Sequence, residues 1–312
     1  MNRKAGIFIV LLLLLPLAAG FAGGQKQGGA QTRTFAVIYP VIHPVFEPCS
    51  RGAEEAAAKL GYKVIINGPV TADVNQQIQI MENLIAQKVD GIAIGPTEST
   101  ALTPLINRAM AQGIQVICFD TDAPESRRLG YIGTDHDKFG LHMGEVLGTI
   151  LNGKGKVLVS MGVPTQLNLQ QRLNGVKQVV AEKYPGISFI DEQTGEGDPN
   201  KTLANIENMV NAHPDFDALI GIDAAAGPAA AIVWKAKGLK KPTIVGDDTE
   251  DIIQGVRDGY ITYTIAQNQY VWGQKIIEEL KDACEGKSVP AFFDAGTRAV
   301  SLENVDKDYP KK

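Results

Sequence analysis

Short runs of hydrophobic residues alternate along this chain with longer segments of mixed polarity. Most of the hydrophobic runs are continuous, which is typical of strands that are covered on both faces of a sheet. Ten of them, from Thr34 onward, predict strands at 35–39, 63–67, 91–95, 115–119, 130–134, 156–160, 187–190, 218–222, 242–246 and 261–266. A strand that is followed each time by a helix indicates βαβ units, so we predict the α/β class with doubly wound parallel sheets.

The segments between the predicted strands have the spacing of amphipathic helices. In 73–88, for example, Met81 and Ile85 recur at the interval that places side chains on one helix face. Asp73 and Gln76 at the start of this segment form a capping-box pattern, in which each side chain satisfies free backbone donors of the first turn. The pattern predicts a helix that begins directly after Asp73.

The chain also repeats its own layout. The strand–helix–strand order of 90–122 recurs in 217–250, and that of 35–66 recurs in 156–190, at an offset of about 120–130 residues. Two copies of one α/β layout indicate two similar lobes. Ligands of open α/β sheets bind beyond the carboxyl ends of the strands, so we expect the ligand in a crevice that both lobes face.

The first 22 residues have the pattern of a secretory signal peptide. A basic start with Arg3 and Lys4 precedes an apolar run that is shorter than the roughly 20 residues needed to span a bilayer, and small residues follow it. We expect cleavage near Ala22 and a flexible leader at 23–32. No cysteine follows the apolar run for attachment of a lipid. The mature protein is therefore expected in the periplasm or extracytoplasmic space.

Composition and charge exclude several classes of protein. A hydrophobic content of 44% excludes intrinsic disorder, and a net charge of −5 argues against a nucleic-acid partner, because phosphate backbones select basic surfaces. The three cysteines, Cys49, Cys118 and Cys284, leave at least one free thiol and no disulfide framework. The sequence has no Cys/His pair at metal-ligand spacing, and we expect neither a metal site nor a cofactor.

Polar side chains collect just beyond the predicted strands. Carboxylates and amides accept and donate hydrogen bonds to hydroxyl groups, and an aromatic face packs on the C–H side of a sugar ring. Their combination favours a neutral polyhydroxylated ligand over an anion. The candidates are His43, Phe46, Asp120, Asp122, Arg172, Asp223, Asp248 and Gln267.

Each candidate has a second explanation within the fold itself. Asp120 and Asp122 could shape a strand-to-helix turn, and Asp248 could cap the helix that follows it. Asp223 could likewise cap a helix, while Arg172 could lie on a solvated helix face. His43 could be an ordinary loop histidine, and Gln267 could serve only a hinge.

Several segments, in this order and spacing, are similar to one known family. They include His43-PVF, Asp90-GIAIGP, Gly113-IQVICFDTD, Tyr131-IGTD, Asn168-LQQRLNGV, Asn211-AHPDFDALIG, Val245-GDD and Thr264-IAQNQYVWG. The chain resembles, over about Thr34 to Leu302, the ribose/galactose-type periplasmic sugar-binding proteins, which are receptors of bacterial ABC importers. The wording of Phe119-DTDAPE and Asn168-LQQR is closest to the glucose- and xylose-like receptors.

The resemblance implies two lobes that close on a sugar about a hinge of three segments, here near 134–135, 267–268 and 291–297. The lobes would then be 33–134 plus 268–293 and 135–267 plus 294–312. The family's sugar-binding positions fall on Phe46, Asp120, Arg172, Asp248 and Gln267, with Asn168 and Asp122 matching some branches.

At four positions the chain departs from the family pattern. Thr121 replaces an arginine, Val45 an aromatic residue, Ile222 an asparagine and His136 another asparagine. These changes leave a pentose, a hexose, a polyol or a furanose-like signal molecule open as the ligand.

We weigh three classes of function. The first is a monomeric receptor that binds a monosaccharide and delivers it to the membrane permease of an ABC importer, or alternatively a receptor that serves chemotaxis or sensing. The second is a glycosidase-like enzyme using Asp120, Asp122 and Asp248, but no nucleophile elbow, Walker loop or dinucleotide fingerprint supports catalysis. The third is a transcriptional regulator, whose DNA-reading helices would stand where the signal peptide does. The resemblance favours the receptor, and we expect no catalytic residue.

One further pattern has two interpretations. Asp135 and Asp137, with His142 on the same predicted helix, could hold a metal ion. Capping of that helix by Asp135 explains the same residues, and we expect capping.

Overall fold

The computed structural model describes residues 32–311. The expected signal peptide and all of the leader except its last residue lie outside the described residues, so both stay predictions. Within 32–311, no helix has both the length and the apolar character required to traverse a lipid bilayer.

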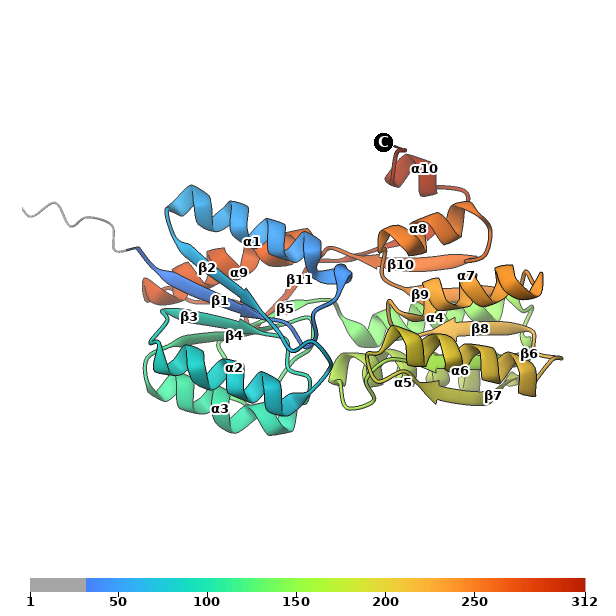
Figure 1. Cartoon of the computed structure of the whole chain (residues 1–312), viewed down its shortest axis with the longest axis horizontal. Coiled ribbons are helices and arrows are strands. Elements are labelled where there is room, and N and C mark those ends of the chain that lie inside the picture. Colours follow the sequence, from blue (N-terminus) through green and yellow to red (C-terminus); the bar gives the residue numbers. More distant parts are fainter. Residues whose placement is uncertain (1–31, 312) are drawn as a thin grey trace, which may run out of the picture. The chain divides into compact units, whose positions relative to one another are not determined.

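Two six-stranded sheets organise the described chain (Figure 1). The first sheet has the order β11-β5-β4-β3-β1-β2, made of β1 (Thr34–Ile38), β2 (Lys63–Asn67), β3 (Gly91–Ile94), β4 (Gln115–Phe119), β5 (Tyr131–Gly133) and β11 (Phe292–Asp294). The second has the order β12-β10-β9-β8-β6-β7, made of β6 (Lys154–Met161), β7 (Gly186–Thr194), β8 (Ala218–Gly221), β9 (Thr243–Gly246), β10 (Tyr263–Gln267) and β12 (Thr297–Ser301). The two orders match position by position, as the internal repeat predicts.

Helices cover both faces of each sheet. In the first lobe these are η1 (Pro44–Phe46), α1 (Glu47–Leu60), α2 (Val74–Ala86), α3 (Ser99–Ala111) and α9 (Gln269–Cys284). In the second they are α4 (His136–Ile150), α5 (Leu167–Lys183), α6 (Pro199–Ala212), α7 (Ala226–Lys237), α8 (Glu250–Arg257) and α10 (Val305–Asp308). Helices α1 and α9 lie on one face of the first sheet, and α2 and α3 lie on the other (Figure 1).

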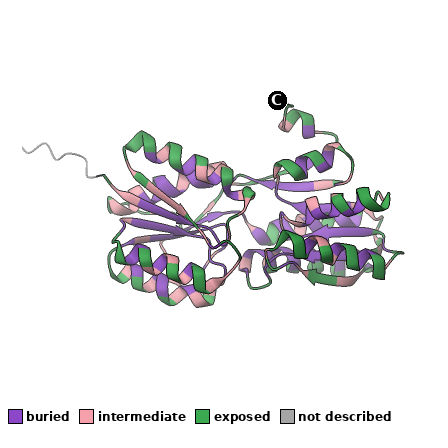
Figure 2. Cartoon of the chain, viewed as in Figure 1, coloured by how far each residue is buried: buried purple, intermediate pink, exposed green. Residues whose placement is uncertain are grey.

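Successive side chains of the strands point to opposite faces of the sheet and pack into two separate hydrophobic cores. In β1, Phe35 and Val37 pack with α1 and α9, whereas Ala36 and Ile38 pack with α2 and α3, and all four are fully buried. Figure 2 shows the central strands of both sheets buried along their length. Burial on both faces explains why these strands are continuous hydrophobic runs in the sequence.

Side-chain caps fix the start of two helices that the sequence singles out. Asp73 caps α2 by accepting from the backbone N–H of Asn75 at 2.8 Å and of Gln76 at 3.3 Å. The side-chain N–H of Gln76 donates to the carboxylate of Asp73 at 3.4 Å, whereas in a capping box the side-chain oxygen of Gln76 would accept from the backbone N–H of Asp73. Asp135 caps α4 by accepting from the N–H of Lys138 at 3.0 Å, which confirms the capping interpretation of this residue.

The second sheet differs from the expectation at its edge. Strand β12 pairs with β10 in the antiparallel sense, so this sheet is mixed, and the segment 291–297 that we expected only as a hinge contains β11 and the start of β12. Much of β12 is exposed at the sheet edge and only Val300 is fully buried. A strand that is buried at one position has no continuous hydrophobic run to signal it.

Three short connections link the elements of the two sheets. They are 134–135 between β5 and α4, Asn268 between β10 and α9, and 295–296 between β11 and β12. Two of them touch, because the side-chain amide of Asn268 donates to the carbonyl oxygen of Ala295 at 3.3 Å.

Candidate functional site

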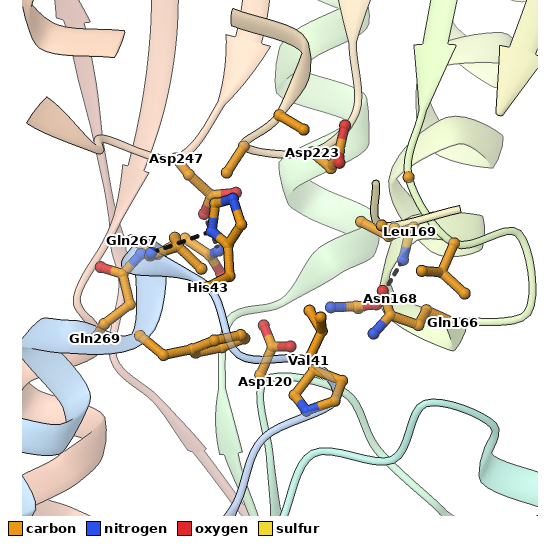
Figure 3. A pocket seen from close by; sticks show the side chains of 18 of the residues that line it. Val41, His43, Asp120, Gln166, Asn168, Leu169, Asp223, Asp247, Gln267 and Gln269 are labelled. Carbon is orange, nitrogen blue, oxygen red and sulfur yellow. Dashed lines mark hydrogen bonds between the residues drawn. The ribbon is translucent and has the colours of Figure 1, made fainter. Parts of the chain in front are cut away.

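A cavity of roughly 620 Å³, including the space at its mouth, lies at the carboxyl ends of strands from both sheets. Figure 3 shows side chains from both lobes around it, with the carboxylate of Asp120 pointing into the space. Contacts between the lobes border the cavity, including the N–H of Asn168, which lies 3.4 Å from Oγ1 of Thr121.

Asp120 is the first residue after β4 and is one of five residues other than glycine with a positive φ in the described chain, at 60°. Its backbone N–H donates to the carbonyl oxygen of Ile132 at 3.0 Å, so the left-handed turn is anchored on β5. The residue is only 6% exposed. Burial raises the pKa of Asp120 to about 7, although the charge of Arg172 opposes this rise.

Asp247 is the matching residue after β9 and also has a left-handed backbone, with φ 71°. Its N–H donates to the carbonyl oxygen of Ile265 at 2.8 Å. The side-chain amide of Gln267 donates to Oδ1 at 2.5 Å, and Nη1 of Arg172 lies 3.6 Å from Oδ2. Asp247 therefore enters the cavity already held by two neighbours.

Arg172 is the buried cation of the cavity. It lies on α5, is 1% exposed, and stacks over the ring of Phe139 at 4.2 Å. Its Nε donates to Nδ1 of His136 at 3.1 Å, and its Nη1 donates to the carbonyl oxygen of Ile222 at 3.1 Å. The alternative of a solvated helix face for Arg172 is therefore wrong.

The first lobe adds an aromatic wall. Phe46 ends η1, and its ring stacks on that of Tyr39 at 4.6 Å with an interplanar angle of 12°. His43 fixes this turn, because its Nδ1 accepts from the N–H of Val45 at 3.2 Å. Burial lowers the pKa of His43, so its ring is neutral at pH 7 and adds no positive charge to the cavity.

The structure gathers most of the residues that the sequence singles out. Seven of the nine candidates line the cavity, namely His43, Phe46, Asp120, Asn168, Arg172, Asp223 and Gln267. Asp122 does not line it, because both carboxylate oxygens accept from the guanidinium of Arg128. Asp122 therefore shapes the turn after β4, which is the alternative role that the sequence left open.

Asp248 lies outside the cavity lining as well. Its carboxylate accepts from the hydroxyl of Tyr309 and lies 3.8 Å from Arg298. It does not cap α8 either, since that helix begins at Glu250 with Thr249 in the cap position. In the structure, Asp248 thus neither lines the cavity nor caps α8, which were the two roles considered for it.

Asp247 takes the place in the cavity that was expected for Asp248. The signal for it was present in the predicted strands, because 115–119 and 242–246 end directly before Asp120 and Asp247, so that the repeat of strand ends pairs these two residues. Gln269 and Trp272, on the first turn of α9, also line the cavity and were missed. The sequence analysis looked for polar residues just beyond predicted strands, and these two residues lie inside a helix.

Unpartnered polar atoms gather at this cavity. Among residues 32–311, six buried side-chain nitrogen or oxygen atoms have no hydrogen-bond partner. Four of the six belong to residues that line the cavity: Asp223, Gln267, Gln269 and Trp272. A buried polar group without a partner is costly, so such a cluster is typical of a site whose ligand supplies the missing hydrogen bonds.

The pKa of a second carboxyl is also raised. Burial, with the nearby charge of Asp247, raises the pKa of Asp223 to about 6. In the part of the chain that the structure describes, the cavity included, no three His, Cys, Asp or Glu side chains are arranged to hold a metal ion. His142 instead lies with its Nε2 at 3.1 Å from the hydroxyl of Tyr263.

Comparison with known proteins finds relatives that are named as sugar-binding proteins. The chain is 28% identical over 248 residues to the ribose import binding protein RbsB of Bacillus subtilis, covering 78% of this chain and 79% of that one. It is 31% identical to the D-ribose/D-allose-binding protein of Pseudomonas aeruginosa, covering 68% and 70%. These relatives are binding proteins rather than enzymes.

Solved structures agree in fold. A solute-binding protein of an ABC transporter from Burkholderia graminis, in complex with D-arabinose, superposes with a TM-score of 0.84 at 33% identity and covers 89% of this chain and 98% of that one. The glucose-galactose binding protein GanP of Geobacillus stearothermophilus has a TM-score of 0.83 at 26% identity, covering 90% and 100%. The family model for the periplasmic binding protein domain matches residues 35–288, and the chain belongs to this family.

Proposed function

We propose that this protein is an extracytoplasmic receptor that binds one monosaccharide in the cavity between its lobes and delivers it to an ABC-type importer. The observation that carries the proposal is the cluster of unpartnered buried polar atoms on residues that line one cavity. A ring with several hydroxyl groups can donate to Asp223 and Gln267 and accept from Gln269 and Trp272 at once.

The charges around the cavity support a neutral ligand. Three carboxyl groups line it, on Asp120, Asp223 and Asp247, against the single guanidinium of Arg172. An anionic ligand would add a further negative charge to a buried site that already has an excess of carboxylates. Phe46 offers an aromatic edge or face to the apolar side of a sugar ring.

The lobes of this receptor are 33–134 plus 268–293 and 135–267 plus 294–312, and its hinge is formed by 134–135, 267–268 and 291–297. The three connections between the sheets support these bounds. A ligand that contacts both lobes favours the closed arrangement, because only there are all its contacts made together. The permease would then recognise the closed protein.

The other parts of the proposal follow from the sequence and the family. The protein is exported through its signal peptide, acts outside the cytoplasm as a monomer, and needs no cofactor. The candidate ligand residues are His43, Phe46, Asp120, Asn168, Arg172, Asp223, Asp247, Gln267, Gln269 and Trp272, all of which line the cavity.

A thermal-shift screen of the mature chain against pentoses, hexoses, polyols and amino acids tests this function. A ligand that binds only the folded state raises the apparent unfolding temperature by mass action, and free ligand at about 100 times Kd adds about 2.7 kcal/mol. We expect a rise with a pentose or hexose and none with amino acids. Stabilisation by amino acids alone would contradict the proposal.

Calorimetry then locates the site. We expect one sugar per chain, and loss of binding when Asp120 is replaced by alanine. Glu192, on the exposed edge strand β7, provides a matched control, since its carboxylate pairs with Lys177 away from the cavity. Glu192→Ala should bind as the wild type does. Equal affinity of both variants would show that the sugar binds elsewhere.

A further inference from the structure

One buried histidine connects the cavity residues of the two lobes. His136 is the first residue of α4, directly after the connection 134–135, and is 3% exposed. Its Nδ1 lies 3.1 Å from Nε of Arg172, and its Nε2 lies 2.7 Å from the backbone carbonyl oxygen of Asp120. The same ring therefore touches the buried guanidinium of the second lobe and the backbone beside the buried carboxylate of the first.

The direction of these hydrogen bonds follows from the arginine. Nε of Arg172 can only donate, so Nδ1 of His136 accepts and the ring proton is on Nε2. Nε2 then donates to the carbonyl oxygen of Asp120, which also accepts from the hydroxyl of Tyr131 at 2.7 Å. One tautomer satisfies every contact.

The charges around the ring favour this neutral form. Burial and the adjacent guanidinium of Arg172 lower the pKa of His136 well below its ordinary value. The hydroxyl of Tyr131 on β5 lies 3.0 Å from Nε2, while the carboxylate of Asp135 is directed to Lys138. A charged ring would have no acceptor at Nδ1 and would lose the contact with Arg172.

The backbone contact reaches a strained position. The carbonyl oxygen that accepts from His136 belongs to Asp120, whose φ of 60° is unusual for a residue with a side chain. Hydrogen bonds from His136 and Tyr131 hold the carbonyl group of Asp120, and the carbonyl oxygen of Ile132 on β5 holds its N–H. The direction in which the carboxylate of Asp120 points into the cavity depends on how this backbone is held.

We propose that His136 is a positioning residue that ties Arg172 of the second lobe to the main chain of Asp120 in the first, so that guanidinium and carboxylate meet the ligand in one fixed relation. The inference rests on the proposed function, since it assigns these two side chains to the ligand. It gives a role to the residue that replaces asparagine in the family pattern.

Three substitutions separate the two ends of the tie. His136→Asn keeps an acceptor near the place of Nδ1 but is too short for the carbonyl oxygen of Asp120. His136→Gln keeps a donor near the place of Nε2 without the acceptor, and His136→Phe keeps the ring alone. If the residue ties two partners, loss of either end breaks the tie, and we expect all three variants to lose about ten-fold in sugar affinity.

Comparison of the affinity losses of the three variants tests whether His136 acts as a tie. Near-normal affinity for His136→Asn or for His136→Gln would overturn the proposal, because one contact would then be sufficient. A loss for His136→Phe equal to the product of the other two losses would also overturn it, because the contacts would be independent. His142→Phe is the matched control: its Nε2 contacts Tyr263 within one lobe, and its affinity should stay within two-fold.

A measurement without sugar tests the tie even if no sugar binds. Nitrogen chemical shifts of the empty wild type should show the same neutral tautomer of His136, with its proton on Nε2, at pH 6 and at pH 8. The Nε–H of Arg172 should exchange slowly with solvent in the wild type and in His142→Phe, and rapidly in His136→Phe. A proton on Nδ1 of His136, or equal exchange in all three proteins, would overturn the tie independently of the ligand.

Discussion

Asp120 and Asp247 occupy the same place in the two lobes, yet their surroundings differ. Each is the first residue after the fourth strand of its lobe in chain order, has a positive φ and donates its N–H to the next strand. Asp247 has Gln267 at 2.5 Å and Arg172 at 3.6 Å, whereas no ion pair within 4.0 Å involves Asp120 among residues 32–311. Asp247 is thus held by its neighbours before the ligand arrives. At Asp120, burial outweighs the charge of Arg172 and keeps the pKa raised until a ligand donates to the carboxylate.

Removal of Asp247 should have the largest effect. Asp247→Ala leaves the fully buried Arg172 without its carboxylate, and breaking a buried ion pair costs about 3–5 kcal/mol. We expect that loss in the free energy of unfolding, measured by urea denaturation, together with loss of sugar binding. Asp248→Asn is the control and should cost about 1 kcal/mol and leave affinity within a few-fold, since Asp248 lies outside the cavity. The opposite ranking would restore Asp248 as the ligand residue.

Replacement of Asp120 should move affinity and stability in opposite directions. Asp120→Asn removes an acceptor for sugar hydroxyls and should cost about 2–4 kcal/mol of binding. The pKa of Asp120 is raised to about 7, so the folded state holds its proton more firmly than the unfolded state does. The stability linked to this proton is complete below pH 4 and is lost as the pH rises through 7.

The amide carries no charge, so the empty variant should be about 4 kcal/mol more stable than the wild type at pH 8 and nearly equal to it near pH 4. Unfolding curves at the two pH values check this. A variant that is less stable than the wild type at pH 8 would mean that Asp120 stabilises the empty fold, as Asp247 does.

Sugar affinity should depend on pH through the unpaired half of the site. Hydroxyl groups that donate to the carboxylate of Asp120 favour its charged form, so the sugar lowers the pKa from about 7 and releases a proton. Affinity should therefore be about ten-fold weaker at pH 5.5 than at pH 8. Calorimetry in two buffers of different ionisation enthalpy measures the proton released, and a pH-independent affinity would place the sugar away from Asp120.

The smallest effect is expected at Asp122, two residues from Asp120. Asp122→Asn weakens the pair with Arg128, whose side chains are 18% and 15% exposed, and should cost about 1 kcal/mol of unfolding free energy. Because Asp122 does not line the cavity, sugar affinity should stay within two-fold in calorimetry. A ten-fold loss would show that the turn after β4 positions Asp120.

Much of this fold could be predicted from the sequence because its strands are buried on both faces. The runs around Ile38, Ile117 and Val159 are continuous and hydrophobic, and each is fully buried in a strand. Strands β11 and β12 were missed as strands because they are short and mostly exposed or half-buried, and Val300 is their only buried residue. A strand with so few buried positions needs no hydrophobic run, so periodicity does not reveal it.

The site was predictable where the rule of strand ends applies directly. Asp120, Asp223 and Gln267 lie at such ends and line the cavity. The choice between Asp247 and Asp248 depends on one left-handed residue, whose backbone turns the first carboxylate inward and lets the second reach Tyr309. The hydrophobic periodicity of the sequence does not indicate that turn. The internal repeat does, because it pairs Asp247 with Asp120.

The three crossings between the sheets also have a consequence for synthesis. Helix α9 and strand β11 belong to the first lobe but are made after nearly all of the second, and Trp272, Ile276 and Leu280 of α9 fill the core beneath β1 and β4. A nascent chain that ends before residue 269 therefore holds a half-covered sheet with an exposed apolar face. Neither lobe can be obtained by cutting the gene once, and the first lobe can complete its core only after α9, which begins at Gln269, has been synthesised.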